Sequence, residues 1–498
     1  MFNFLLSEAA RLANAITIGK NRITDEQYIV NEINQFKGSQ KRKDMINGEK
    51  YYAGKHDILS RKRTVIGEKG ELEEVTNLPN NRVVDNQYKK MVNQKKNYLL
   101  GQPISVQCDN EQYAKLLKQM FNKKFQRLIK GIGEDSLNCG LGWMFVYYDE
   151  HGEITFKRMK PFEIIPGWKD AEHTVLDYAI RIYEVIAYEG QQEKVIQKVE
   201  VYDDKGITFF ELIDGGTLKP VEPFTQAYFT ITDEDGVETG YNWTKIPLIP
   251  FKYNDKEIPL IKNIKSLQDG LNVILSNFQN NMEEDTRNTI LILKNYDGQN
   301  LGEFRKNLAA LGAVKVRTVD GADGGVDKLT IEVNAENYKA IIEIFKKAII
   351  ENAMGYDAKD DRLAGNPNQM NIQSMYSDID LDANDMETEY QAAFEDLLWF
   401  INCHFSNMGM GDFDGEQVDI IFNRDILISE GEVIDNCQKS VGVLSDETII
   451  ANHPWVDDPQ KELERLQKQR EENMEQYGLA FNPDINKENE ENQEDISD

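Results

Sequence analysis

The sequence predicts an α+β protein that combines a β-rich region with long amphipathic helices and a small β/α insert. Between residues 140 and 251, apolar side chains recur with period two, which indicates strands. Within Pro259–Phe405 they instead recur every three or four positions in three long segments, which indicates helices. The 498 residues are 40% hydrophobic, enough for two to four domain-sized units with a sizeable core.

Charge and cysteine usage narrow the function classes. The formal net charge is −29, whereas a protein that grips duplex phosphates statically is expected to be basic. The charge therefore indicates either simple solubility or a protein past which nucleic acid moves without being bound statically. The four cysteines are widely spaced without a C-x-x-C pair, so we expect buried small hydrophobic side chains rather than disulfides or zinc ligands.

The start of the chain carries no export or membrane signal. Glu8 and Arg11 interrupt any signal-peptide core in Met1–Arg22. No run of about 18 apolar residues occurs, so we expect no membrane span. We expect the first residues to form a helix of an intracellular protein, with further helix and polar turns to Gly54.

Two more helices are predicted before the strands. Asn77–Leu100 opens as a turn and becomes a helix that ends at Gly101. Its apolar face contains Val84, Tyr88, Met91 and Tyr98. Its four lysines, Lys89, Lys90, Lys95 and Lys96, are predicted to form a solvated face. Glu111–Leu137 is expected to be one amphipathic helix.

The strands of the β-rich region begin with a hairpin. Its strands are Trp143–Tyr148 and Glu153–Met159, around a turn through Asp149 and Gly152. Further strands are predicted at Tyr178–Tyr188, Gln197–Tyr202, Ile207–Leu212 and Ala227–Ile231. We expect the aromatic side chains of this region to be core.

A helix, a small insert and a second helix follow. Pro259 fits the first turn of a helix that runs to about Arg287. Its heptad seam is Leu260, Ile264, Leu267, Leu271, Ile274 and Phe278. The predicted insert comprises strand Thr289–Lys294, helix Leu301–Leu311, strand Ala313–Arg317, loop Gly321–Asp327 and strand Leu329–Val333. The second helix spans Glu336–Asn352.

A polar loop then leads into a very long helix. The loop, residues 356–370, is too polar for a core. Apolar residues repeat every seven positions from Ile372 to Phe405, which predicts one nearly continuous helix. Beyond it we expect a strand at Val418–Asn423, and helices near Glu430–Val443, from Ser445 and from Asp458 to Tyr477.

A calcium-loop pattern occurs within the long helix. Asp378, Asp380, Asp382 and Glu389 occupy its first, third, fifth and twelfth positions. The sixth position is Ala383 rather than glycine, and the heptad face runs through the segment. We therefore predict a solvated acidic helix face and no metal site.

No catalytic constellation stands out in the sequence. It lacks a phosphate loop and the G-x-S-x-G and G-x-G-x-x-G motifs, and its five histidines form no H-E-x-x-H. Acidic pairs are so abundant that none identifies itself as a general acid and base. The sequence therefore predicts a non-enzymatic protein without a cofactor, and long helices without chemistry favour a wall, a ring or a channel.

Several segments, taken in order, resemble one protein family. They are YYAGKHDILSRKR (Tyr51–Arg63), NNRVVDNQYKKMVNQKKNYLLGQPI (Asn80–Ile104), GLGWMFVYYDEHGEITFKRMKPFEIIP (Gly140–Pro166), IPLIPFKYN before PLIKNIKSLQDGLN, and VLSDETIIANHPWVDDPQKELERLQ (Val443–Gln467). Their order and spacing resemble the portal proteins of tailed bacteriophages, in particular the type found in phages of Gram-positive bacteria. The resemblance extends along nearly the whole chain.

The resemblance implies an elongated subunit of several regions that assembles as a ring, usually a dodecamer, at one vertex of the procapsid. The implied regions are a mixed β-rich wing (1–258 with 406–429), stem helices (259–287 and 336–355), a β/α clip (288–335), a tunnel loop (356–370), a long channel or wing helix (371–405) and a helical crown (430–480). The acidic composition of the remaining residues, 481–498, predicts a disordered tail. In the family, the force for packaging comes from ATP hydrolysis by a terminase.

The resemblance also implies partners and contact residues. The partners are double-stranded DNA in transit, a terminase, a head-completion or adaptor protein, and capsid and scaffolding proteins, in the virion and, during assembly, in the host cytoplasm. Candidate DNA-channel residues are Lys346, Lys347, Lys359, Arg362, Asn366 and Asn368. Candidate partner-binding residues of the clip are Lys294, Arg305, Lys306, Arg317 and Lys328. Pairing of the channel cations with Asp360, Asp361, Glu343 or Glu351 is an equally weighted alternative.

Two other function classes stay open at this point. One is an oligomeric scaffold or adaptor that never contacts DNA, and the other is a nuclease that uses a divalent metal at acidic clusters such as Asp378 and Asp380. Heptad stripes do not decide the subunit number, because they fit packing within one chain equally well.

Overall fold

The computed structural model describes residues 25–66, 70–76, 78–213, 216–232, 235–285, 289–294, 325–330, 334–358, 369–424, 430–456 and 462–470. They form helices and sheets, so the predicted α+β class is confirmed. The chain divides into two compact units. The first comprises residues 1–356 and 378–425, and the second comprises residues 357–377 and 426–498.

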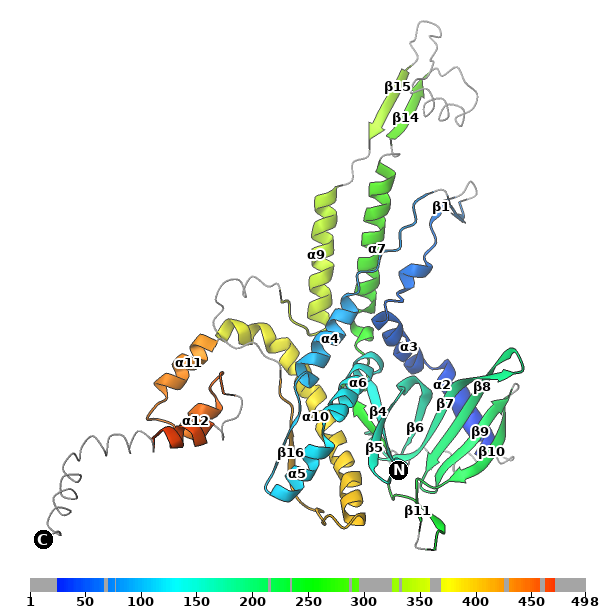
Figure 1. Cartoon of the computed structure of the whole chain (residues 1–498). Coiled ribbons are helices and arrows are strands. Elements are labelled where there is room, and N and C mark those ends of the chain that lie inside the picture. The colour runs from blue at the N-terminus through cyan, green and yellow to red at the C-terminus, as the bar shows by residue number, and fades with distance from the viewer. Residues whose placement is uncertain are drawn as a thin grey trace, which may run out of the picture. The chain divides into compact units, whose positions relative to one another are not determined.

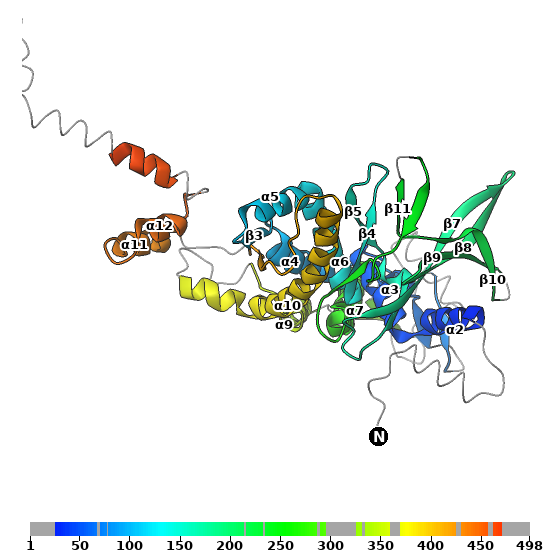
Figure 2. The same ribbon diagram turned by 90° about the horizontal axis from the view of Figure 1, so that it is seen from below.

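A five-stranded antiparallel sheet lies in the first unit (Figure 1). Its strands, in spatial order, are β10 (Thr217–Gln226), β9 (Gly206–Ile213), β8 (Gln192–Asp203), β7 (Leu176–Glu189) and β6 (Ile164–Trp168). Helix α2 (Asp25–Gly38) lies along one face of this sheet (Figure 2), where Ile29 and Ile33 join a core with Ile180 and Val199. The helix and the sheet thus bury each other's apolar faces.

The predicted strands of this sheet are confirmed, but the sequence analysis missed its two edges. Strand β6 contains Pro166 and Gly167, and strand β10 contains Pro220 and Pro223. Proline lacks the N–H that a central strand donates, which weakens a strand signal. An edge strand tolerates the missing donor, and both strands lie at an edge of the sheet.

A three-stranded antiparallel sheet adjoins helix α6 (Lys123–Cys139). Its order is β13 (Leu248–Lys252), β4 (Leu141–Tyr148) and β5 (Ile154–Met159), so the predicted hairpin is confirmed. Gly140, between α6 and β4, has φ 88° and closely approaches the loop that connects β13 to α7. A Cβ there would lie 2.1 Å from the carbonyl oxygen of Glu257, so this position requires glycine.

The single helix predicted over residues 111–137 is wrong, because α5 (Glu111–Met120) and α6 are separate helices. Phe121 leaves the helical conformation with ψ 47°. The side chain of Asn122 then accepts hydrogen bonds from the amides of Lys124 and Phe125, at 2.8 and 3.3 Å. Asparagine is a strong N-cap residue, and this signal overrides the continuous apolar period.

Smaller elements complete the first unit. The helical ones are α3 (Gln40–Tyr52), α4 (Gln87–Leu100) and the 3-10 turns η1 (Asp57–Ser60) and η2 (Pro161–Glu163). The strand pairs are β1 (Thr64–Ile66) with β2 (Leu72–Glu74), β3 (Ser105–Cys108) with β16 (Val418–Ile421), and β11 (Phe229–Thr232) with β12 (Glu238–Tyr241). The predicted strand at 418 is therefore confirmed, with a partner far away in the sequence.

The two helices predicted on either side of the insert are confirmed as α7 (Ile261–Asp285) and α9 (Ala335–Asn352), and they pack side by side (Figure 1). The rings of Phe278 and Tyr338 lie 4.9 Å apart between them. Beyond the helices, β14 (Thr289–Lys294) pairs with β15 (Gly325–Thr330) in antiparallel register. The second of these strands begins within the predicted loop 321–327, so that part of the insert prediction is wrong. The predicted helix 301–311 and strand 313–317 lie outside the described residues.

Helix α10 (Gln369–Asn407) is one continuous helix of 39 residues, as the heptad repeat predicts. The eight repeat residues are all at most 5% exposed: Ile372, Tyr376, Ile379, Ala383, Met386, Tyr390, Ala393 and Leu397. Within the described ranges, no helix is long and apolar enough to cross a membrane.

The second unit contains α11 (Glu430–Lys439), α12 (Asp446–Ala451) and a helical stretch at 462–470. The Ser445 side chain caps α12 by accepting from the amide of Thr448 at 3.3 Å, as the sequence predicts. Arg470 donates to the carboxylate of Asp446 at 2.8 Å. The predictions for residues 1–24 and 471–498 lie outside the described residues.

Candidate functional site

A row of buried polar side chains runs along α7 beside its predicted heptad seam. Its members are four residues apart and at most 1% exposed: Gln268, Asn272, Ser276 and Asn280. Four helical residues advance about 6 Å, nearly the same as two residues of extended chain. Such a row can therefore bond every second amide of an extended segment lying alongside.

The segment that leads into α4 uses this row. Asn280 accepts from the amide of Asn81 at 2.7 Å, and Ser276 accepts from the amide of Val83 at 2.9 Å. Asn272 likewise accepts from the amide of Asp85 at 3.1 Å. Gln268 accepts from the amide of Tyr88, three positions further and already within α4, at 2.9 Å. We call these four residues the α7 polar row. It fixes the position of α7 against the start of α4, because a displaced helix would leave buried amides unpaired.

Helix α4 also holds the point where the chain leaves α9. The side-chain amide of Gln94 donates to the carbonyl of Tyr356 at 2.8 Å and accepts from its N–H at 3.1 Å. The ammonium of Lys95 donates to the carbonyl of Met354 at 3.2 Å. A Cβ on Gly355 would lie 2.7 Å from the Gln94 oxygen and 2.8 Å from the Met91 sulfur. These contacts, which we call the α4 clamp, determine the path of the chain just before residues 359–368.

Lys95 and Lys96 are buried, so the prediction that they lie on a solvated face is wrong; Lys89 and Lys90 are exposed as predicted. Lys95 lies 2.6 Å from a carboxylate oxygen of Asp382, and the Tyr253 hydroxyl donates to the same carboxylate at 2.5 Å. Burial lowers the pKa of Lys95, although Asp382 opposes this effect.

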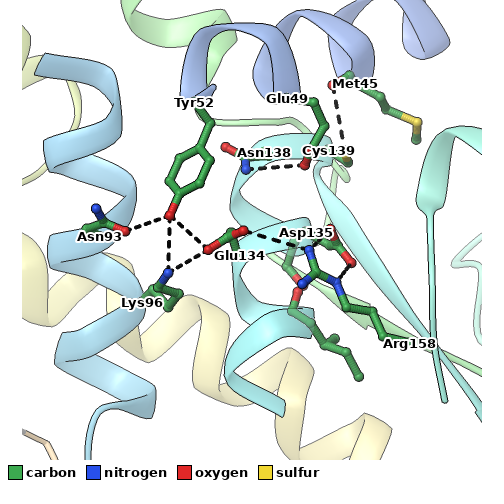
Figure 3. A network of polar contacts seen from close by, with 12 residues as sticks. Met45, Glu49, Tyr52, Asn93, Lys96, Glu134, Asp135, Asn138, Cys139 and Arg158 are labelled. Carbon is green, nitrogen blue, oxygen red and sulfur yellow. Dashed lines mark hydrogen bonds and ion pairs between the residues drawn. The ribbon is translucent and has the colours of Figure 1, made fainter. Parts of the chain in front are cut away.

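Lys96 belongs to a second polar network, shown in Figure 3. Its ammonium lies 2.6 Å from Glu134, and the Tyr52 hydroxyl donates to the same carboxylate at 2.9 Å. Arg158 binds both oxygens of Asp135 at 2.5 Å. Burial alone would raise the pKa of Glu134, but the hydrogen bonds from Lys96 and Tyr52 outweigh it and lower the pKa. The network ties α3, α4, α6 and β5 together (Figure 3).

Glu257, in the loop before α7, joins three segments. Its carboxylate, 3% exposed, accepts from His173 at 2.7 Å and from Lys41. Glu257 and His173 both have positive φ, 54° and 59°, and the His173 ring stacks on Trp168 at 5.0 Å. Burial raises the pKa of Glu257, but the hydrogen bonds and charges of His173 and Lys41 outweigh it and lower the pKa to about 2.

The calcium-like carboxylates of α10 serve as internal counter-ions. Asp380 accepts from Tyr98 and, at 3.0 Å, from Arg424. Asp382 forms an ion pair with Lys95, and Glu389 lies 3.8 Å from Lys252. Asp378, by contrast, is exposed. The continuous helix is confirmed, but the prediction of a fully solvated face is wrong. Among the described residues, no group of three or more Asp, Glu, His or Cys side chains could hold a metal ion.

The predicted channel residues are only partly described. Lys346 lies 2.8 Å from Asp85, and Lys347, whose side chain is 78% exposed, lies 3.8 Å from Glu351. The pairing of Lys347 with Glu351 is the alternative considered in the sequence analysis, whereas the partner of Lys346 is an acid that it did not consider. The remaining channel candidates, Lys359, Arg362, Asn366 and Asn368, lie outside the described residues.

The predicted clip residues are also divided. Lys294 is the last residue of β14 and pairs in register with Gly325, while Lys328 on β15 pairs with Leu291. Arg305, Lys306 and Arg317 lie outside the described residues. The structure therefore brings two of the five candidates onto one strand pair.

The α7 polar row and the α4 clamp were missed by the sequence analysis. The row had a visible signal, the spacing Q-x3-N-x3-S-x3-N within an amphipathic helix. The clamp had no local signal, since Gln94 and Tyr356 are 262 positions apart. Both arrangements hold backbone segments against α4 or α7, so the first unit is organised around the α7–α9 helix pair.

The chain belongs to the family of phage portal proteins of the SPP1 Gp6-like type, whose profile matches residues 36–476. It is 28% identical over 439 residues to the portal protein of Bacillus phage SPP1, covering 87% of this chain and 84% of that protein. It is 26% identical over 438 residues to the portal protein of Clostridium phage phiCD119, covering 86% of this chain and 92% of that protein. The family is generally structural, and phage portal proteins are components of the virion capsid.

Proposed function

We propose that this chain forms a ring, a dodecamer as is usual in the family, at the portal vertex, and that double-stranded DNA passes through its centre during packaging and ejection. The observation that carries the proposal is the α7–α9 helix pair, fixed at its base by the α7 polar row and the α4 clamp. A passage under load needs walls whose helices keep their positions, and both contacts resist sliding of these helices.

The charges of α9 suit a surface along which DNA slides. Its exposed lysines face acids one turn further along: Lys339 lies 4.0 Å from Glu343, and Lys347 lies 3.8 Å from Glu351. Exposed pairs of this kind contribute little to stability. They do cancel the local charge, so phosphates would be neither trapped nor strongly repelled.

The loop after the α4 clamp is the proposed place of DNA contact. The clamp holds Tyr356, and the loop 356–370 carries Lys359, Arg362, Asn366 and Asn368, which can donate to phosphate oxygens. A loop fastened at its start can touch a moving duplex without shifting the helices. Lys346 and Lys347 would add contacts further along α9.

The region beyond the helix pair is the proposed docking site for other proteins. Lys294 and Lys328 on the β14–β15 pair, with Arg305, Lys306 and Arg317, would meet acidic surfaces of the terminase and later of a head-completion or adaptor protein. Capsid and scaffolding proteins would contact the ring during assembly in the host cytoplasm. The chain itself would supply no chemistry, and ATP hydrolysis by the terminase would drive packaging.

Replacing Lys359 and Arg362 by alanine tests the DNA contact. We expect reduced packaging of DNA into procapsids, with the oligomer mass by native mass spectrometry unchanged. A matched control replaces Lys89 and Lys90, two exposed lysines of α4, and should package normally. Normal packaging by the loop variant would refute the loop's role, and a variant that no longer forms the wild-type oligomer would assign these residues to assembly instead.

A further inference from the structure

Residues 115–130 form a basic segment in this strongly acidic chain. The segment covers the end of α5, the turn at Asn122 and the first turns of α6, and it contains no Asp or Glu. Its six cations are Lys115, Lys118, Lys123, Lys124, Arg127 and Lys130. Five of them are exposed, and Lys130 is partly exposed. We call these six residues the α5–α6 basic surface.

These cations have no counter-ions of their own. Within the described ranges none of the six forms an ion pair: Glu134 and Asp135 of α6 are engaged by Lys96 and Arg158, and Asp149 and Glu153, which line the same cavity as Lys124 and Arg127, form no ion pair with them. The N-terminus of α6, a helix of 17 residues, adds positive partial charge beside Lys123 and Lys124. A local positive potential therefore remains, although the chain as a whole has a net charge of −29.

The composition of this surface fits phosphate better than protein. The cores of protein interfaces are apolar and depleted in lysine. Residues 111–140 include no exposed large hydrophobic side chain, whereas such side chains occur elsewhere, for example Ile186 and Tyr188 on the β7–β8 hairpin. Exposed lysine and arginine, flanked by the amides of Gln119 and Asn122, are the usual donors to nucleic-acid backbones.

We infer that the α5–α6 basic surface binds the phosphate backbone of duplex DNA without base specificity. It is separate in sequence from residues 356–370 and from α9. The inference therefore goes beyond the proposed passage of DNA: it assigns this chain a second DNA contact, one that needs no threading through a ring.

The test measures binding of relaxed, covalently closed circular duplex DNA to the assembled full-length protein between 50 and 200 mM salt. A closed circle cannot thread a closed ring, so it reports only outer contacts. The test variant carries K118Q, K123Q, K124Q and R127Q. The control variant carries K43Q, K55Q, K205Q and K219Q, four exposed lysines elsewhere in the first unit, and changes the net charge equally.

The slope of log K against log salt is negative, and each lost phosphate contact should reduce its magnitude by about 1. The slope of the test variant should therefore be about 4 less negative than that of the wild type, and its affinity at 50 mM salt about tenfold or more lower. The control variant should keep the wild-type slope within about 1. Thermal melting and oligomer mass of both variants confirm that assembly is intact.

An unchanged slope in the test variant, or equal losses in both variants, would overturn the inference. A labelled peptide of residues 482–498 serves as a carboxylate probe. If the four substitutions abolish binding of this peptide but not of DNA, the surface binds an acidic protein segment instead. Passage of linear DNA is scored separately in the packaging assay, so failure here is distinguishable from failure of the proposed channel.

Discussion

Gln94 on α4 holds the backbone of Tyr356 through two hydrogen bonds, one to its carbonyl at 2.8 Å and one from its N–H at 3.1 Å. These two hydrogen bonds, part of the α4 clamp, connect a helix to a backbone segment 262 positions away in the sequence. The α4 clamp thus lies where the chain leaves the helix pair, immediately before residues 357–370, which carry the proposed DNA contact.

Replacing Gly355 by alanine should break the α4 clamp. The new Cβ would lie 2.7 Å from the Gln94 oxygen, so Gln94 has to move and its bonds to Tyr356 break. We expect faster tryptic cleavage after Lys359 and Arg362, and reduced packaging. The control is Gly38→Ala, where a Cβ meets nothing within 4 Å. Equal cleavage rates in the two variants would show that the clamp does not restrain the loop.

The α7 polar row predicts that replacing two serines of this helix by alanine has different effects on stability. Ser276→Ala leaves the partly buried amide of Val83 without its acceptor, which should cost about 1–3 kcal/mol. Ser266→Ala, at an exposed position of α7, should be neutral or slightly stabilising because alanine favours helix. Urea unfolding monitored by tryptophan fluorescence compares them. A Ser276→Ala variant as stable as Ser266→Ala would contradict the role of the row.

The ion pair of Lys95 and Asp382 predicts that the losses of stability caused by replacing each residue do not add in a double-mutant cycle. Lys95→Met or Asp382→Leu alone leaves one buried charge unpaired and should destabilise by about 3–5 kcal/mol. The double variant should cost much less than the sum, since neither charge remains. Urea midpoints of the four proteins give the coupling energy. Additive effects would mean that the two charges act independently.

The lowered pKa of Glu257 predicts that the folded protein loses stability in acid. Its folded pKa, about 2, lies below the ordinary value of 4.5, so the carboxylate stabilises the fold at neutral pH. This contribution, about 2–3 kcal/mol, should decline as pH falls from 4.5 to 2. Glu257→Gln should therefore be less stable than wild type at pH 7, and the gap should narrow in acid.

The matched control for this experiment is Glu150→Gln, at an exposed turn residue. Thermal melting from pH 7 to pH 2.5 compares the three proteins. A gap between wild type and Glu257→Gln that stays constant across this range would contradict the lowered pKa.

Helix positions could be predicted from the sequence because their signals are local. The seven-residue repeat from Ile372 to Leu397 gives the length of α10, and all eight repeat residues are buried. The capping residue Ser445 likewise marks the start of α12. Such periodicity and capping patterns are properties of neighbouring residues and need no tertiary information.

The surroundings of single polar residues could not be predicted in this way. Lys95 and Lys96 have the pattern of a solvated helix face, yet their counter-ions, Asp382 and Glu134, come from other elements. A local pattern contains no information about such partners. For the same reason, the clamp between Gln94 and Tyr356 is visible only once the fold brings them together.

The most direct test of the central claim is cryo-electron microscopy of the purified full-length assembly. The account predicts a closed ring whose central opening admits duplex DNA, with α7 and α9 of every subunit beside that opening and residues 359–368 facing it. A filament, a closed assembly without an opening, or a ring with α7 and α9 on its outer rim would contradict it.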